Sequence, residues 1–283
     1  MILTNPLLQK EFRQRMRTKR APFVITGYLL FMVALTFGLL YESLQGQTII
    51  SLTVRSEQIF VALSWLQMAI AAFLTPAFAA GSVSGERERR TLPVLMTTPL
   101  TPLGVIVGKI LSSSALVVLL LVVTLPLYSL VFLFGGAVPQ EVLSVFAFQL
   151  FSIFVIASIS VMFSSIALQS AWSTVLSYGM VSFMLIVSGV VGYGLRLLAL
   201  HNAIDAFAAG WGDQLLNLNP LWIEASLENA ETGSPGSWVV FVGFYLLVCA
   251  VLLIPALYRL RPRGWTKRSR RPLQPKERDS SRL

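Results

Sequence analysis

Six long apolar segments, almost free of charge, constrain the fold of this sequence more than any other feature. They cover about residues 22–43, 58–81, 106–134, 142–168, 173–195 and 237–259. Each is close to the roughly 20 residues that an α-helix needs to cross about 30 Å of hydrocarbon. Backbone groups in lipid must be satisfied within the chain, and these segments lack the alternating pattern of β-barrel strands. The sequence therefore predicts an all-α membrane protein with six transmembrane helices.

The basic residues of the sequence fall mainly on one side of this six-span plan. Twenty of the 22 lysines and arginines lie in the first 20 residues, between residues 81 and 109, or from Arg259 onward, whereas Arg55 and Arg196 lie on the other side. The positive-inside rule therefore predicts that both termini and the 81–109 segment are cytoplasmic. We expect a multi-pass protein of the plasma (inner) membrane, with its first span retained because no small-residue cleavage site follows it.

The chain divides into three parts on this plan. Residues 1–21 are predicted to form a cytoplasmic amphipathic elbow helix, residues 22–259 the transmembrane domain, and residues 260–283 a cytoplasmic tail. The tail is polybasic and broken by prolines, so we expect it to be disordered and attracted to anionic lipid. Nucleic-acid binding is not expected, because the tail contains no folded module that reads bases.

The N-terminal segment has apolar residues at helical spacing and basic residues on its other faces. Such a helix lies at the membrane interface with its apolar face in the lipid. The side chains that we expect to define this elbow helix are Leu8, Phe12, Arg13 and Arg17. Two roles are compatible with this pattern: an anchor on membrane lipid, and an elbow that also contacts a cytoplasmic partner.

The segment 82–105, with the stretch GERERRTLPVLMTTPLTP, is longer than a connection between two spans requires. Its charged residues, Glu86 to Arg90, are of mixed sign and are expected to pair with one another beyond the membrane. The apolar residues that follow predict a short helix parallel to the membrane. Thr98-Pro99 and Thr101-Pro102 both have the pattern of an N-cap followed by the first residue of a helix. The segment is either a solvated loop or a docking site for a soluble protein, since exposed apolar surface rimmed by charge commonly marks a binding site.

The stretch SGERERRTLPVLMTTPLTPLGVIVGK resembles the cytoplasmic loop of type-2 ABC transporter permeases. The similarity lies in Glu86 and Glu88, Thr91-Leu92, Leu95, Thr98-Pro99 and Gly108-Lys109. Two positions differ from the family pattern, because Arg90 stands where glycine is usual and Pro93 where glutamate is usual. The wider plan agrees with the same family, which has an elbow helix, six spans and a large outer segment before the last span.

The resemblance implies that this chain is the permease subunit of an ATP-driven exporter, in which two identical or homologous permease subunits form the pathway. A separate cytoplasmic ABC ATPase would bind ATP and Mg²⁺, and the loop helix would be a coupling helix docked on it. The residues implied to couple are Glu86, Arg87, Glu88, Arg89, Arg90, Thr91, Leu92, Leu95, Met96, Thr98 and Pro99. We expect no catalytic residue, cofactor or metal in this chain, whose nearest approach to a P-loop, GVIVGKI, lacks one residue and the Ser or Thr that holds Mg²⁺.

The segment 196–236 is neither a span nor a simple loop. Residues 195–209 have helical periodicity, and a second short helix is predicted to begin at Asn219-Pro220. The resemblance implies short outer or re-entrant helices that cap the pathway, and we expect their acidic residues at the surface. The candidate residues of this outer segment are Trp211, Asn219, Pro220 and Trp222, with the two tryptophans suited to the membrane boundary. The single histidine, His201, is expected to be a surface imidazole.

Two other functions are compatible with the sequence: a polytopic membrane enzyme, and a membrane scaffold whose cytoplasmic loop recruits a soluble partner. The acidic residues between 205 and 231 form the only cluster that an enzyme site could use, and their spacing specifies no chemistry. The six spans contain almost no ionisable residue at hydrocarbon depth, which a proton- or ion-coupled carrier usually needs. This pattern favours a pathway driven by a separate ATPase. Small residues in the fourth and fifth spans are predicted to allow close helix packing.

Overall fold

A computed structural model of the protein describes residues 20–44, 49–91, 101–133, 139–201, 205–228 and 236–260. These residues form helices and the turns between them, with no β-strand in the part described. Six helical segments within these ranges are long and apolar enough to cross a membrane: Pro22–Tyr41, Glu57–Glu88, Pro102–Ser129, Pro139–Ile166, Ser170–Leu200 and Ser237–Leu260. The all-α prediction and its six spans are confirmed.

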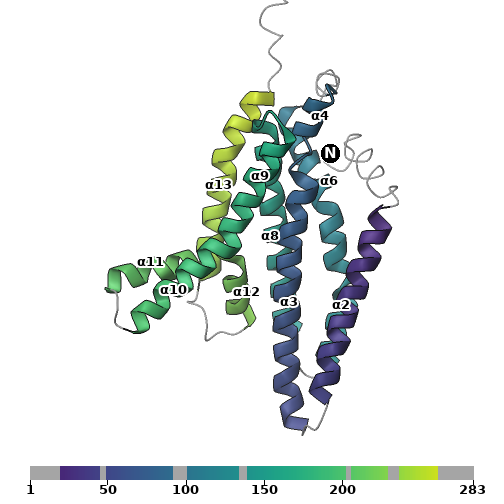
Figure 1. Ribbon diagram of the computed structural model, residues 1–283, viewed down its shortest axis with the longest axis vertical. Coiled ribbons are helices and arrows are strands. Elements are labelled where there is room, and N and C mark those ends of the chain that lie inside the picture. The colour runs from purple at the N-terminus through teal and green to yellow at the C-terminus, as the bar shows by residue number, and fades with distance from the viewer. Residues whose placement is uncertain are drawn as a thin grey trace, which may run out of the picture.

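The spans form an elongated bundle around one central helix (Figure 1). Its main helices are α2 (Arg20–Leu44), α3 (Ile49–Ala79), α6 (Pro102–Val123), α8 (Pro139–Ile166), α9 (Ser170–Ser182) and α13 (Ser237–Leu260). Helix α8 packs against α3, α6, α9 and α13, and most of its side chains are buried. The short helix α4 (Ser84–Glu88) lies at the end of the bundle where α8 ends and α9 begins, and we call this the α4 end.

The small polar residues of the fourth span are buried within the bundle. Those exposed by 1% or less include Gln149, Ser152, Ser160, Ser164 and Ser165. Their positions confirm the prediction that this span packs closely. The turn to the next span comprises residues 167–169, so the fifth span begins at Ser170, three residues before the predicted start at residue 173.

Two spans are interrupted helices. The third span ends its first helix at Val123 and resumes as α7 (Leu125–Leu133) after Thr124, next to Pro126. The fifth span consists of α9, the π-helical turn η1 (Phe183–Val187) and α10 (Ser188–Leu200). Pro76, in contrast, lies inside α3, which continues through it.

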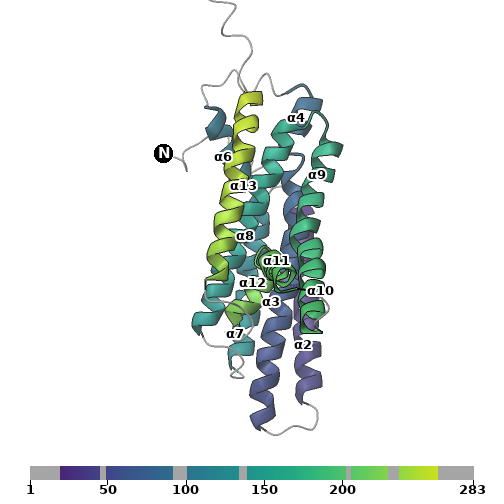
Figure 2. The same cartoon turned by 90° about the vertical axis from the view of Figure 1, so that its left-hand side faces the viewer.

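Helices α10 and α11 (Ala206–Leu216) form a hairpin that extends sideways from the bundle and points at the viewer in Figure 2. A Cβ built on Gly192 would lie 2.8 Å from Leu216 Cγ and 3.0 Å from the Gly212 carbonyl oxygen, so the two helices touch at glycines. The helix predicted over residues 195–209 is therefore wrong in its bounds: α10 ends at Leu200, and α11 is a separate helix.

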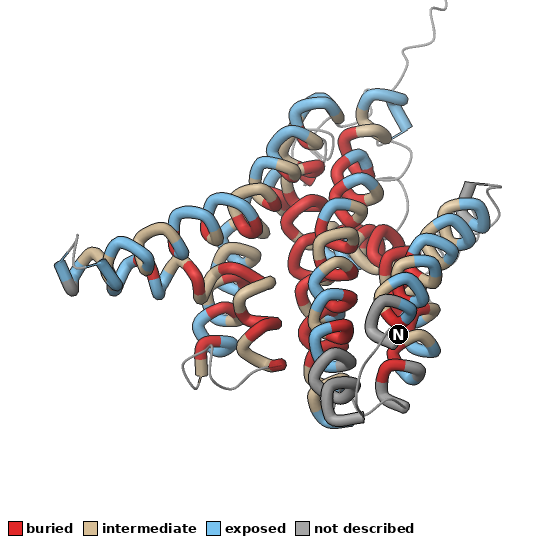
Figure 3. Tube along the Cα trace, turned by 60° about the horizontal axis from the view of Figure 1, so that its bottom comes forward, coloured by how far each residue is buried: buried red, intermediate tan, exposed pale blue. Residues whose placement is uncertain are grey.

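The chain then returns to the bundle as α12 (Pro220–Glu228), which confirms the short helix predicted to begin at Asn219-Pro220. Helix α12 packs against α8, α3 and α13. In Figure 3 its inner face is buried, whereas the α10–α11 hairpin is largely exposed. The acidic residues of α12 were expected at the surface, but Glu224 and Glu228 are 0% and 8% exposed. That expectation is wrong because α12 lies against the spans and not beyond them.

Candidate functional site

Helix α4 begins with backbone N–H groups that are bound by another helix. The N–H groups of Val83 and Ser84 both donate to the hydroxyl oxygen of Ser164 on α8, at 3.0 Å each. The first N–H groups of a helix have no partner within it, so a side-chain oxygen at this place acts as a cap. Ser173 on α9 donates to the Ala80 carbonyl oxygen in the preceding turn, at 2.6 Å. The start of α4 is therefore fixed on α8 and α9.

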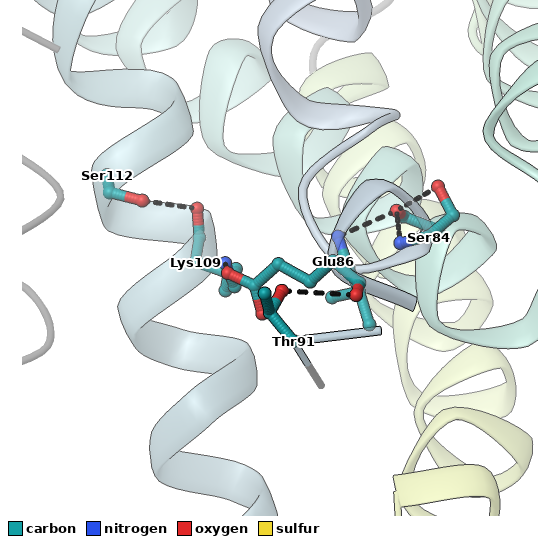
Figure 4. A network of polar contacts seen from close by, with 7 residues as sticks. Ser84, Glu86, Thr91, Lys109 and Ser112 are labelled. Carbon is teal, nitrogen blue, oxygen red and sulfur yellow. Dashed lines mark hydrogen bonds and ion pairs between the residues drawn. The ribbon is translucent and has the colours of Figure 1, made fainter. Parts of the chain in front are cut away.

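Glu86 joins α4 to the third span. The ammonium group of Lys109 on α6 lies 2.5 Å from Glu86 Oε1 (Figure 4). The Lys109 side chain is 3% exposed and that of Glu86 is 28% exposed. Because water screens a pair in such a place only in part, the ion pair fixes the position of α4 relative to α6.

Arg87 joins α4 to the end of the fourth span. Its guanidinium donates to the carbonyl oxygens of Ser165, at 2.9 Å, and Ala167, at 2.5 Å. Arg259 at the end of α13 donates to the carbonyl oxygen of Ile166 between them, at 2.5 Å. The last carbonyl groups of a helix lack partners within it and carry partial negative charge. Two arginines from different elements thus bind the C-terminal end of α8.

Glu88 joins α4 to the start of α9. One of its carboxylate oxygens accepts from the Ser170 backbone N–H at 2.7 Å, and the other accepts from the Ser170 hydroxyl at 2.6 Å. A carboxylate is favoured at a helix N-terminus for the same reason that an arginine is favoured at a C-terminus. Three successive side chains of α4 therefore bind three different helix segments.

The prediction that the charges from Glu86 to Arg90 pair with one another is wrong for the first three of them. Consecutive residues of a helix point in different directions and do not face each other. Helix α4 lies among α6, α8 and α9, so Glu86, Arg87 and Glu88 each contact a different neighbour. Arg89, Arg90 and Thr91 are exposed at the surface of the same turn.

The end of α4 shows why glycine is usual in the family at position 90, where this chain has an arginine. Arg90 has φ of 57°, in the left-handed region. The N–H of Thr91 donates to the Glu86 carbonyl oxygen at 2.9 Å, and the N–H of Arg90 donates to the Arg87 carbonyl oxygen at 3.1 Å. These two bonds define a Schellman motif, whose left-handed position is usually glycine. Glycine is thus the residue that this backbone favours at position 90.

The other residues predicted to couple, Leu92, Leu95, Met96, Thr98 and Pro99, lie outside the described residues, as do Leu8, Phe12, Arg13 and Arg17 of the elbow helix. The chain is described again from Thr101. The Thr101 hydroxyl accepts from the Gly104 N–H at 3.2 Å, and Pro102 is the first residue of α6. Of the two predicted N-caps, the one at Thr101-Pro102 is confirmed, and the one at Thr98-Pro99 lies outside the described residues.

Comparison with known protein families agrees with this geometry. A family model described as ABC-2 family transporter protein matches residues 6–265. The chain belongs to the ABC-2 transporter family. A search of curated proteins found no match. The protein is thus a multi-pass membrane permease subunit. In this permease, the short helix α4 makes the contacts that link α6, α8 and α9.

The outer segment of the permease contacts the bundle through Asn219. Its side-chain amide donates to the Leu185 carbonyl oxygen of η1 at 2.9 Å, and its side-chain oxygen accepts from the Leu221 N–H at 2.9 Å. A π-helical turn leaves backbone groups without their usual partners, so the amide of Asn219 satisfies one of them. A Cβ on Gly189 would lie 2.6 Å from this amide nitrogen.

The two candidate tryptophans of this segment differ in their surroundings. Trp211 is exposed on α11 beside Phe207, with ring centroids 6.2 Å apart. Trp222 on α12 lies under the guanidinium carbon of Arg196, at 5.2 Å from the ring centroid. The exposed Trp211 suits a lipid headgroup region. The cation–π contact of Arg196 helps to hold Trp222 in its place. His201 is exposed at the end of α10, as expected.

A polar cluster that the sequence analysis missed lies where α12 meets the spans. Gln149 on α8 donates to Glu224, and Ser64 and Trp65 on α3 contact the carboxylate of Glu228. Burial, and then the charge of Glu228, raise the pKa of Glu224 well above its usual range. Burial raises the pKa of Glu228 from 4.5 to about 7 against the opposing effect of the Ser64 and Trp65 hydrogen bonds. One signal in the sequence was Gln149 in an apolar span, since a buried amide requires a hydrogen-bond partner.

Proposed function

We propose that this permease is the membrane subunit of an ATP-driven exporter, in which two permease subunits form the pathway. A separate ABC ATPase binds ATP and Mg²⁺ and drives it through the segment 82–105. The observation that supports this proposal is the set of bonds made by α4, since Glu86, Arg87 and Glu88 tie one helical turn to α6, α8 and α9. A displacement of this turn would act on three spans at once.

The orientation in this proposal follows from charge. The α4 end faces the cytoplasm of the plasma (inner) membrane, because basic residues collect in the segments that adjoin it. The exposed side chains of Arg89, Arg90 and Thr91 then face the ATPase. The export direction follows the resemblance of the 82–105 segment to type-2 permeases.

Single-cysteine variants test the orientation and the partner together. The chain has one cysteine, Cys249, so Cys249→Ala provides a background without thiols. Arg89 directly follows α4, Gln214 lies on α11, and both are exposed. Figure 1 shows α4 at one end of the bundle and α11 in the hairpin at its side. We expect an impermeant maleimide to label Gln214→Cys in intact cells, and Arg89→Cys only in inside-out vesicles. Labelling of Arg89→Cys from outside would overturn the proposal.

The same pair of variants identifies the partner. A thiol-reactive photo-cross-linker on Arg89→Cys is expected to capture a chain with a P-loop, and Gln214→Cys is the matched control that captures none. Leu95→Asp should remove both the cross-link and co-purification, because it places a charge in the apolar stretch of the loop. Permease that purifies from native membranes without any ATPase would count against the proposal.

A membrane scaffold would give a different result with Arg87→Gln. This substitution removes the charged contact with the α8 end and leaves the exposed face of α4 unchanged. A driven permease should keep its ATPase but lose the effect of transport inhibitors or substrates on ATP hydrolysis. A scaffold should keep both its partner and the partner's hydrolysis rate.

A further inference from the structure

The buried carboxyl groups of Glu224 and Glu228 are not explained by the contacts at the α4 end. They are four residues apart on α12, so they lie on the same face of that helix. This face packs against α8 and α3. Figure 1 shows α12 beside these helices and not beyond their ends. The two acids are therefore inside the bundle, although neither belongs to one of the six spans.

The surroundings of the two carboxyl groups contain few charges. Within the described residues, neither forms an ion pair with a basic side chain. Arg196 stacks on Trp222 of the same helix. The other titratable groups that act on this pair are an acid and a phenol on neighbouring elements, Glu141 on α8 and Tyr128 on α7. Two ionised carboxylates at this place would be poorly compensated.

The contacts of Glu228 are ones that a protonated carboxyl can make. The Ser64 hydroxyl lies within hydrogen-bond distance of the Val61 carbonyl oxygen, at 2.9 Å, and of Glu228 Oε1. A serine hydroxyl has one hydrogen and cannot donate it to both oxygens. If Ser64 donates to Val61, as serines in helices commonly do, the hydrogen of the second bond comes from Glu228. Glu228 Oε2 accepts from the Trp65 indole at 3.2 Å.

The hydrogen-bond contacts of Glu224 also leave room for a proton on its carboxyl group. The Gln149 amide nitrogen donates to Glu224 Oε1 at 2.5 Å and to the Ser64 carbonyl oxygen at 3.1 Å, which uses both of its hydrogens. Glu224 Oε2 and Gln149 Oε1 are buried and have no hydrogen-bond partner in the described residues. A proton on Glu224 would neutralise the carboxyl and remove the cost of burying an uncompensated charge.

We propose that Glu224 and Glu228 form a proton-binding site that holds at least one proton at neutral pH and whose deprotonation weakens the packing of α12 on α3 and α8. Both carboxyl groups share the site, so their titration is coupled and the protons belong to the pair. Its ligand is the proton itself, and no cavity for a larger ion is required. The site stands independently of the proposed function, because it follows from the contacts of α12 alone.

Infrared spectroscopy of the purified full-length chain in detergent tests the site directly. A protonated carboxyl has a C=O absorption that an ionised one lacks. We expect this absorption in the wild type at neutral pH and its loss in the double variant Glu224→Gln/Glu228→Gln. The matched control is Asp213→Asn, an exposed acid on α11, which should leave the band unchanged. A wild-type chain without the band at neutral pH would overturn the proposal, even if no variant folds.

Thermal unfolding provides the second measurement. Burial raises the pKa of Glu228 to about 7 from 4.5, so the unfolded chain ionises this group before the folded chain does. The stability that the protonated Glu228 contributes is therefore fully present below pH 4.5, and it is lost as the pH rises toward 7. We expect the unfolding temperature of the wild type to fall over this interval, and the fall to be smaller in Glu228→Gln but not in Asp213→Asn. An equal fall in all three proteins, or stabilisation by sodium ions in place of protons, would refute the site.

Discussion

Replacing Glu86 by glutamine tests whether α4 is rigidly joined to the third span. The change removes the carboxylate 2.5 Å from the Lys109 ammonium, which is 3% exposed. Removing one partner of a buried ion pair costs about 3–5 kcal/mol, whereas an exposed pair contributes about 0–1 kcal/mol. Because the Glu86 side chain is 28% exposed, partial hydration should reduce the cost to about 2–3 kcal/mol.

A double-mutant cycle isolates the pair from the other contacts of each residue. Glu86→Gln, Lys109→Met and the double variant are unfolded by denaturant in the same detergent. We expect each single substitution to be destabilising and the double variant to recover part of the loss, since a neutral pair leaves no uncompensated charge. The coupling energy should be about 2 kcal/mol.

Arg89→Gln is the control for a general effect of charge on α4. It lies on the same helical turn but is exposed, so its effect should remain within about 0.5 kcal/mol. A coupling energy below about 0.5 kcal/mol for the Glu86–Lys109 pair would be that of a solvated pair. The argument that α4 moves α6 through this contact would then be refuted.

Four further outcomes follow from the same contacts, each measured by thermal or denaturant unfolding in detergent. Ser164→Ala removes the acceptor of two α4 N–H groups and should cost about 1 kcal/mol, with proteolysis near α4 as a local readout. Arg90→Gly should stabilise the chain by up to about 1 kcal/mol, because φ is 57° at this residue. Gly192→Ala should cost about 1–3 kcal/mol, since its Cβ would lie 2.8 Å from a leucine side chain of α11, whereas Gly194→Ala meets no atom within 4 Å and should gain about 0.5–1 kcal/mol. The contribution of Glu228 to the free energy of unfolding, measured as the difference between the wild type and Glu228→Gln, should fall by about 3 kcal/mol between pH 4.5 and 7, where only the unfolded chain ionises this group. A flat profile in that interval would contradict this last expectation.

The spans could be predicted from the sequence because the hydrocarbon thickness imposes one length and one composition on every crossing helix. The N-cap at Thr101-Pro102 could be predicted for a similar reason, since a hydroxyl followed by proline is favoured at a helix start whatever surrounds it. These features depend on the solvent or on a few adjacent residues. They need no knowledge of which helices lie side by side.

The partners of α4 and the burial of α12 could not be predicted because they depend on tertiary packing. From the sequence alone, the acidic and basic residues of α4 are as compatible with pairing among themselves as with contacts to other helices. Glu224 and Glu228 read as surface acids, although Ile223 and Leu227 on the same short helix have the apolar character of a packed face. The stronger indication was in the spans, where the glutamines at 67 and 149 required buried partners.

The two polar clusters of the permease are connected through α3 and α8. Helix α3 contacts Glu228 through Ser64 and Trp65, and its chain continues into α4, whereas α8 contacts Glu224 through Gln149 and is held at its far end by Arg87. Glu224 and Glu228 belong to one short helix, so their spacing is nearly fixed. A sliding of α3 against α8 therefore cannot keep the bonds of both carboxyl groups. Any displacement of α4 that moves α3 and α8 unequally must change the environment of at least one buried proton.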